Sequence, residues 1–236
     1  MPVSEGGVIL VALYGALLGA RHALEPDHLA AVSTMAAHGS SRSDVLRVSA
    51  AWGAGHASLI LLAGILLTFL GVKMPPALEG RADTVVGLAL VALGALTLSS
   101  LRRDRIHLHR HTHDARPSHV HFHLHPHDAG HATHPQPPAW LRRPLTAFAI
   151  GTLHGTAGSG AAVALAVLVA PSRMAAIIYL LSFGLGSLVG MVAVGVFAMW
   201  PIIRISSRAH VARQLVQAVA GMTSVVVGVL LAANLL

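Results

Sequence analysis

The sequence predicts an all-α, polytopic membrane protein with six transmembrane helices arranged as two inverted three-helix repeats. Hydrophobic residues make up 54% of the 236-residue chain, whereas Asp, Glu, Lys and Arg together contribute only 11%. Soluble domains carry roughly 25% charged residues, so the bilayer is the expected solvent. Six apolar runs are each long enough to cross a hydrocarbon core of about 30 Å. They cover residues 6–37, 44–70, 77–101, 144–170, 174–200 and 211–236.

The first apolar run contains a proline and is too long for one straight helix. Pro26 lacks a backbone donor and clashes with the preceding helical turn, so we expect a break between residues 21 and 28. Irregular backbone at membrane depth is tolerated only where protein or a water-filled cavity surrounds it. We also expect this run to stay in the mature protein, because residues 1–7 include Glu5 and lack the positive charge of a signal peptide. The break is therefore a candidate functional site.

Positive charge is concentrated on one side of the predicted spans. The segments that join the first run to the second, the third to the fourth and the fifth to the sixth hold most of the arginines. Only Lys73, Arg81 and Arg173 lie on the opposite side. By the positive-inside rule, the arginine-rich side faces the cytoplasm. Both termini are then expected outside, and the segment between the third and fourth runs is expected in the cytoplasm.

The two halves of the chain carry similar short segments. Residues 19–23 (Gly-Ala-Arg-His-Ala) align with residues 151–155 (Gly-Thr-Leu-His-Gly), and residues 53–56 align with residues 184–187. We therefore divide the chain into a first three-helix repeat (1–101), a His-rich loop (102–140) and a second three-helix repeat (141–236). Because each half has an odd number of spans, the second lies upside down relative to the first. Inverted repeats with a site at their interface recur in transporters.

Six ionisable side chains lie inside or at the edge of the apolar runs. Such groups are costly in a membrane and usually face the bundle interior, where they serve a pathway. Imidazoles and carboxylates suit a divalent first-row metal such as Ni, Co, Cu or Zn, and the chain has no cysteine to supply thiolate ligands. The candidate metal ligands are His22, Glu25, Asp27, His28, His56 and His154.

Two structural roles compete with metal binding. Asp27 could cap a helix end by accepting hydrogen bonds from exposed amides, and His56 could be a core histidine bonded to a backbone carbonyl. His154 aligns with His22 in the repeat, so we expect it at the same site. Ser159, which aligns with Asp27, and Ser187, which aligns with His56, are expected to line the pathway.

Histidine makes up 11 of the 28 residues between positions 107 and 134. Alternation brings imidazoles to one side of an extended chain, and such tracts bind Ni, Zn or Cu through many weak sites. The segment is too polar to pack, so we expect disorder, and a simple solvated linker is the alternative. The residues expected to capture metal are His107, His109, His111, His113, His119, His121, His123, His125, His127, His131 and His134.

Residues 21–28, Arg-His-Ala-Leu-Glu-Pro-Asp-His, resemble the signature of the nickel/cobalt transporter (NiCoT) superfamily: a His, four further residues and then Asp-His. Residues 55–56 (Gly-His) and 153–155 (Leu-His-Gly) resemble further motifs of its compact six-span, UreH-type branch. The histidine-rich loop is similar to that of the family's efflux members. Together these similarities cover nearly the whole chain.

The resemblance implies movement of Ni(II) or Co(II) across a bacterial cytoplasmic membrane, with His22, Asp27 and His28 essential to selection and passage. The chain departs from the larger importers of the family at two points. Glu25-Pro26 stands where they usually carry Asp-Ala, and the acidic patch of their later spans has no counterpart between residues 144 and 170.

We therefore expect a transporter of Ni(II) or Co(II), in either direction, and not an enzyme. The ion is the expected substrate, and no prosthetic group is expected. Lipid and transition-metal ions are the expected partners and self-association is left open, whereas nucleic acid is excluded because the arginines flank apolar runs. The alternatives are a membrane-bound metal store or chaperone acting through the loop, an intramembrane metallohydrolase in which Glu25 activates water, and a haem-binding electron carrier.

Overall fold

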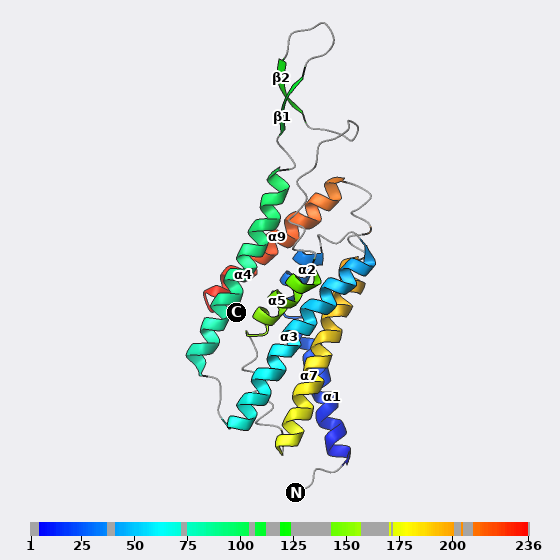
Figure 1. Cartoon of the computed structure of the whole chain (residues 1–236), viewed down its shortest axis with the longest axis vertical. Coiled ribbons are helices and arrows are strands. Elements are labelled where there is room, and N and C mark those ends of the chain that lie inside the picture. The colour runs from blue at the N-terminus through cyan, green and yellow to red at the C-terminus, as the bar shows by residue number, and fades with distance from the viewer. Residues whose placement is uncertain are drawn as a thin grey trace.

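The computed structural model describes residues 5–36, 41–71, 75–103, 107–111, 119–123, 143–156, 170, 172–200, 204 and 210–235. These residues form a bundle of helices with one short β-hairpin (Figure 1). In chain order the elements are α1 (Glu5–His22), α2 (Pro26–Ala36), α3 (Arg42–Leu70), α4 (Pro76–Arg103), β1 (His107–His111), β2 (His119–His123), α5 (Pro144–His154), α7 (Arg173–Ala193), the π-helical segment η2 (Val194–Met199) and α9 (His210–Ala232).

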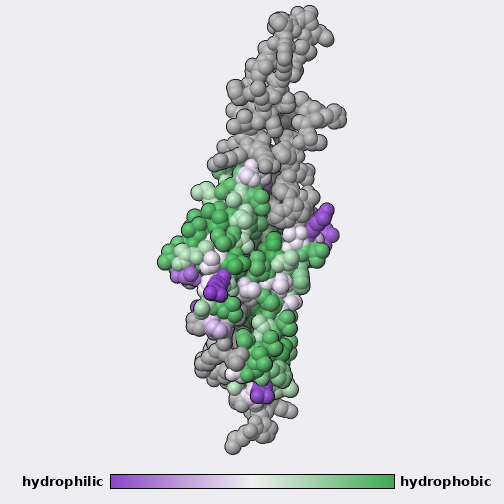
Figure 2. Space-filling view, turned by 60° about the vertical axis from the view of Figure 1, so that its left-hand side comes forward, coloured by the Kyte–Doolittle hydropathy of each residue, from purple (hydrophilic) through white to green (hydrophobic). Residues whose placement is uncertain are grey.

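Long apolar helices dominate the described part of the chain. Four are long and apolar enough to cross a membrane, at Arg42–Leu70, Ala77–Leu101, Arg173–Phe197 and Gln214–Ala232. The pair α1 and α2 makes a fifth candidate if it counts as one bent span. Their outer surface is mostly apolar (Figure 2), and Leu10 on α1 is 69% exposed. The predicted polytopic helical membrane protein is confirmed, while the predicted run 144–170 is described only at 144–156 and 170.

The first predicted span is broken where its proline lies. α1 ends at His22, α2 begins at Pro26, and the two helices are bent by 62°. Proline suits the first position of α2, because the amide that it lacks has no partner within a helix at that position. The Glu25 amide donates to the His22 carbonyl over 3.0 Å, which closes the turn between the helices. The predicted break between residues 21 and 28 is confirmed.

Glycines bring helices of the two halves into backbone contact at matching positions. A Cβ added at Gly19 of α1 would collide with the Phe183 carbonyl of α7, and one added at Gly151 of α5 would collide with the Trp52 carbonyl of α3. Gly19 aligns with Gly151, and Trp52 aligns with Phe183. Each half therefore inserts the glycine of its first helix against the second helix of the other half.

The reverse contacts follow the same rule. A Cβ at Gly55 of α3 would collide with the Phe148 carbonyl of α5, and one at Gly186 of α7 would collide with the Ala16 carbonyl of α1. The equivalent helices α3 and α7 run in opposite directions (Figure 1). Small residues permit such close approach between membrane helices. The reciprocal packing supports the inverted repeat that the aligned segments predict.

The His-rich loop contains a short antiparallel hairpin that extends from the helical body (Figure 1). Its register pairs His107 with His123, His109 with His121 and His111 with His119. The prediction of disorder throughout residues 102–140 does not hold for these two segments, and the predicted boundary at 101 falls two residues before the end of α4. Alternation of His with Leu, Val and Phe has the period of a strand, which gives a physical reason for the hairpin. The remaining loop histidines, His113, His125, His127, His131 and His134, lie outside the described residues.

Replacing Gly151 by alanine is expected to lower the free energy of unfolding by about 1–3 kcal/mol, because the added methyl group falls on the Trp52 carbonyl. Gly6→Ala is the matched control, since a Cβ there meets nothing within 4 Å. Thermal unfolding in detergent, followed by size-exclusion chromatography, should give a lower midpoint for Gly151→Ala only. Equal midpoints for the two variants would show that the close approach of α3 and α5 contributes nothing to stability.

Candidate metal centre

Four histidines from four helices meet beside the break in the first span. His22 ends α1, His28 lies in the first turn of α2, His56 is in α3 and His154 ends α5. Their exposed fractions are 7%, 1%, 0% and 2% respectively, so all four are interior groups. The His28 ring lies 4.3 Å from that of His22, 4.8 Å from that of His56 and 5.1 Å from that of His154, measured between centroids. His28 is thus the centre of the cluster.

The rings of His22 and His56 face each other through nitrogen atoms. Their Nε2 atoms are 3.3 Å apart, and His22 Nδ1 lies 2.9 Å from Glu25 Oε2. A neutral imidazole has one N–H and one lone pair, so a His22 ring that donates to Glu25 turns its lone pair toward His56. Two nitrogens bound to one ion at about 2.1 Å lie roughly 3.0–3.4 Å apart for angles of about 90–109°. The observed separation fits two ligands of one ion.

His28 is held in a similar way by Asp27. Its Nδ1 donates to Asp27 Oδ1 over 2.9 Å, and its buried Nε2 has no hydrogen-bond partner among the described residues. The other carboxylate oxygen of Asp27 accepts a hydrogen bond from His154 Nε2 over 3.1 Å. Carboxylates commonly fix the tautomer and orientation of metal-binding histidines in this way. Asp27 therefore joins two of the four rings.

The cluster contains two overlapping groups of potential ligands. One is His22, His28 and His56, and the other is Asp27, His28 and His154; in each group the ligand atoms lie within 4.8 Å of one another. The sequence predicts all of these residues as ligands, and the structure brings them together. The carboxylate of Asp27 contacts imidazole rings, and His56 contacts His22. These contacts argue against the helix cap and the core-histidine alternatives.

Trp52 is a member of the site that the sequence analysis does not identify. Its ring lies 5.7 Å from that of His28, 5.9 Å from that of His56 and 5.4 Å from that of His154. The buried indole Nε1 has no hydrogen-bond partner among the described residues. The signal was available, because Trp52 precedes His56 by four residues and residues at that spacing share a helix face. An oxygen ligand on a bound ion, such as water, would suit this donor.

The remaining predicted site residues occupy different positions. Glu25 is half-exposed and its described contact is with His22 Nδ1, so it lies at the edge of the cluster. Ser187 is fully buried and its hydroxyl has no partner among the described residues, but no described contact joins its side chain to the histidines. Ser159 lies outside the described residues.

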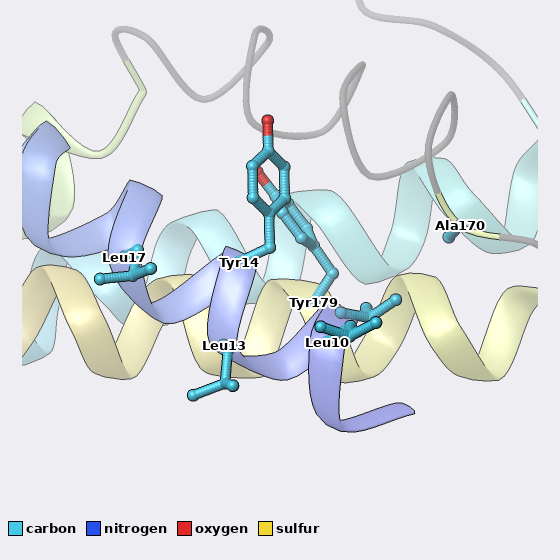
Figure 3. A pocket seen from close by; sticks show the side chains of 7 residues that line it. Leu10, Leu13, Tyr14, Leu17, Ala170 and Tyr179 are labelled. Atoms are coloured by element: carbon cyan, nitrogen blue, oxygen red, sulfur yellow. The ribbon is translucent and has the colours of Figure 1, made fainter. Parts of the chain in front are cut away.

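A separate apolar pocket of about 520 Å³ lies along α1 (Figure 3). Leu10, Leu17 and Tyr14 line it from α1, and Tyr179 lines it from α7. The rings of Tyr14 and Tyr179 are 6.4 Å apart. None of its lining residues is a carboxylate or an imidazole. Its chemistry suits an apolar group and not a divalent cation.

Comparison with protein-family models identifies the family of this chain. Residues 8–172, which include all four clustered histidines and both carboxylates, match the family model of NicO, described as high-affinity nickel-transport protein. The chain belongs to the NicO family. This result confirms the resemblance to the NiCoT superfamily and its UreH-type branch, and it agrees with a transport role in place of an enzymatic one.

Relatives of this NicO protein occur in bacteria and plants. The urease accessory protein UreH of Bacillus sp. (strain TB-90) is 29% identical over 184 residues, which cover 76% of this chain and 72% of that protein. The chloroplast proteins FOR GROWTH AND FERTILITY 1 and 2 of Arabidopsis thaliana are each 28% identical over 80% of this chain. The matched regions span 49% and 47% of those two proteins. No solved structure matches.

Nickel binding to this NicO protein is expected to quench most of the fluorescence of Trp52, because the open-shell ion would lie against the indole ring. The chain has three tryptophans, so the measurement uses the Trp140→Phe, Trp200→Phe double variant, in which Trp52 alone emits. Adding His56→Ala to that background should abolish the quenching. Equal quenching with and without His56 would place the bound nickel elsewhere.

Proposed function

We propose that this protein carries Ni(II), and Co(II) as a second substrate, across the membrane through an ion site formed by His22, His28 and His56. One observation carries the proposal: three buried imidazoles from three helices converge, with two Nε2 atoms 3.3 Å apart and the Nε2 of His28 unpartnered among the described residues. Membership in a nickel-transport family supports nickel as the substrate. The likeness to UreH, a urease accessory protein, is consistent with it.

In this proposal the carboxylates act mainly on the histidines. Glu25 holds the proton of His22 on Nδ1, and Asp27 does the same for His28, so the Nε2 atom of each ring keeps its lone pair for an ion. Only a neutral imidazole binds metal, and this arrangement keeps the lone pairs available. His154 is connected to the site through Asp27 and serves the passage of the ion away from the first three ligands.

Selectivity in this site comes from geometry. Copper would bind an N/O site more tightly than nickel on intrinsic affinity, so ligand type alone does not select nickel. Three protein nitrogens leave further coordination positions for water, and the Trp52 indole supplies a donor next to them. A six-coordinate ion needs the three nitrogens at angles near 90° with three positions left for water, whereas zinc with three histidines and one water needs angles near 109°. The angle that the helices impose on the nitrogens is therefore the proposed basis of selection.

The hairpin in the loop supports a role in capturing metal before or after passage. Its register places three histidines of one strand opposite three of the other. Directly opposed residues of an antiparallel pair have Cβ atoms about 4.5–5.5 Å apart, and alternate residues along a strand share a face. By the positive-inside rule we propose that this loop lies in the cytoplasm and both termini lie outside. The membrane that we propose is the bacterial cytoplasmic membrane, which the family resemblance implies. All eleven loop histidines, from His107 to His134, are included in the proposed capture segment.

His22→Ala and His56→Ala are each expected to reduce nickel flux at least tenfold, because each removes one of three ligands. Glu25→Ala should weaken nickel affinity by about 10–100-fold, as loss of an orienting carboxylate does at other metal sites. His210→Ala, at the first residue of α9, is the matched histidine control. The measurement is nickel uptake into proteoliposomes, with cobalt and zinc as parallel substrates. Wild-type flux in His22→Ala would contradict the proposed site.

Deleting residues 105–134 is expected to leave nickel flux at saturating nickel largely intact while raising the half-saturating concentration. This result would show that the loop supplies metal to the intramembrane site but forms no part of the ion pathway. The same proteoliposome assay, run over a range of nickel concentrations, separates the two effects. Complete loss of flux, together with full flux in His22→Ala, would instead support a metal store or chaperone that acts through the loop.

A further inference from the structure

The clustered ligands form two half-sites that overlap at one histidine. The first comprises His22, His28 and His56, and the second comprises Asp27, His28 and His154. His22 and His154 are equivalent positions of the inverted repeat, each at the last residue of its helix. Each half of the protein therefore supplies the terminal histidine of one half-site. His28 belongs to both.

Only one nitrogen of His28 is available to an ion. Its Nδ1 lies 2.9 Å from Asp27 Oδ1 on the side of the second half-site, whereas its Nε2 is buried and unpartnered among the described residues. A neutral imidazole has one lone pair in the ring plane, and its proton occupies the other nitrogen. When Nδ1 donates to Asp27, only Nε2 is available to an ion. The two half-sites therefore cannot both use His28 at the same time.

The geometry points to a relay in which a single ion passes from the first half-site to the second while His28 remains a ligand. This inference rests on the proposed transport of nickel and adds the order of events within it. Asp27 lies where it can act in both stages, first as a hydrogen-bond acceptor and then as a ligand. In the first it accepts hydrogen bonds from His28 and His154. In the second it gives up the hydrogen bond from His154 and binds the ion, while His154 exchanges its Nε2 proton for one on Nδ1 through the water carried by the ion, so that its Nε2 lone pair also binds.

The surrounding helices are suited to a short step of this kind. The pairs α1–α7 and α3–α5 are in backbone contact at glycines, and α3 also packs against α7. These contacts together fix His22, His56 and His154 relative to one another. His28 and Asp27 lie on α2, on the other side of the bend, and α2 packs against α9. A small movement of α2 relative to the other helices shifts the shared ligand and the shared carboxylate together.

The relay predicts that His154 is needed for flux but not for initial binding. His154→Ala should bind nickel within about threefold of wild type, measured in detergent by quenching of Trp52 in the Trp140→Phe, Trp200→Phe background, while flux into proteoliposomes falls at least tenfold. His154→Gln keeps a hydrogen-bond donor for Asp27 but is a poor nickel ligand, so it should behave like His154→Ala. His56→Ala should lose binding and flux together. Leu145→Ala, at an exposed position of the same helix, is the matched control and should retain both.

Each alternative outcome is decisive. Two nickel ions bound per chain in the variant that lacks residues 105–134, with all other residues unchanged, would overturn the shared use of His28. Wild-type flux in His154→Ala would overturn the second half-site, and parallel loss of binding and flux in that variant would indicate one undivided site. Absence of nickel flux in the wild-type protein itself would overturn the proposed function and, with it, the relay. A variant that elutes as aggregate is replaced by His154→Gln, which retains the hydrogen bond to Asp27.

Discussion

The need to hold ionisable groups in the interior of a lipid-immersed bundle governs this structure. A polar group with no partner in the hydrocarbon region costs several kcal/mol, so buried imidazoles and carboxylates have to satisfy one another. Asp27 accepts a hydrogen bond from one nitrogen of His28 and one of His154, and Glu25 accepts one from a nitrogen of His22. Three nitrogens, His28 Nε2, His56 Nδ1 and Trp52 Nε1, have no partner among the described residues. A hydrated cation would supply a partner for two of them, because the metal accepts the lone pair of His28 Nε2 and its water accepts from the Trp52 indole.

Glycine contacts set the spacing of these groups. Because Gly19 and Gly151 place α1 and α5 directly on the backbones of α7 and α3, the positions of His22 and His154 depend on main-chain contact and not on flexible side chains. The same contacts occur twice, once in each half. A site at the interface of the halves is therefore built from equivalent elements, and the differences between the halves, such as His56 against Ser187, make it asymmetric.

Much of this arrangement follows from sequence. The apolar runs predict the helices, Pro26 predicts the break, and ionisable residues within the runs predict which side chains meet. The aligned segments around Gly19 and Gly151 predict the repeat. The pairing of particular nitrogens does not follow, because spacing along the chain says nothing about how a 62° bend turns Asp27 toward α5. The role of Trp52 does not follow from sequence either, since an aromatic residue in a membrane helix is ordinarily a packing residue. The hairpin is also not predicted, because its polar composition outweighs its alternating pattern.

The ends of α1 and α5 have a consequence for the charge of the cluster. Both helices terminate at a histidine of the site, so the carbonyl ends of both point toward it. A helix carries the equivalent of about half a negative charge at that end. Two such ends offer a divalent cation a favourable potential while the buried part of the site contains one formal carboxylate. The empty site then carries one formal negative charge in addition to these partial charges, so it attracts a divalent cation with less fixed charge than a site built from several carboxylates.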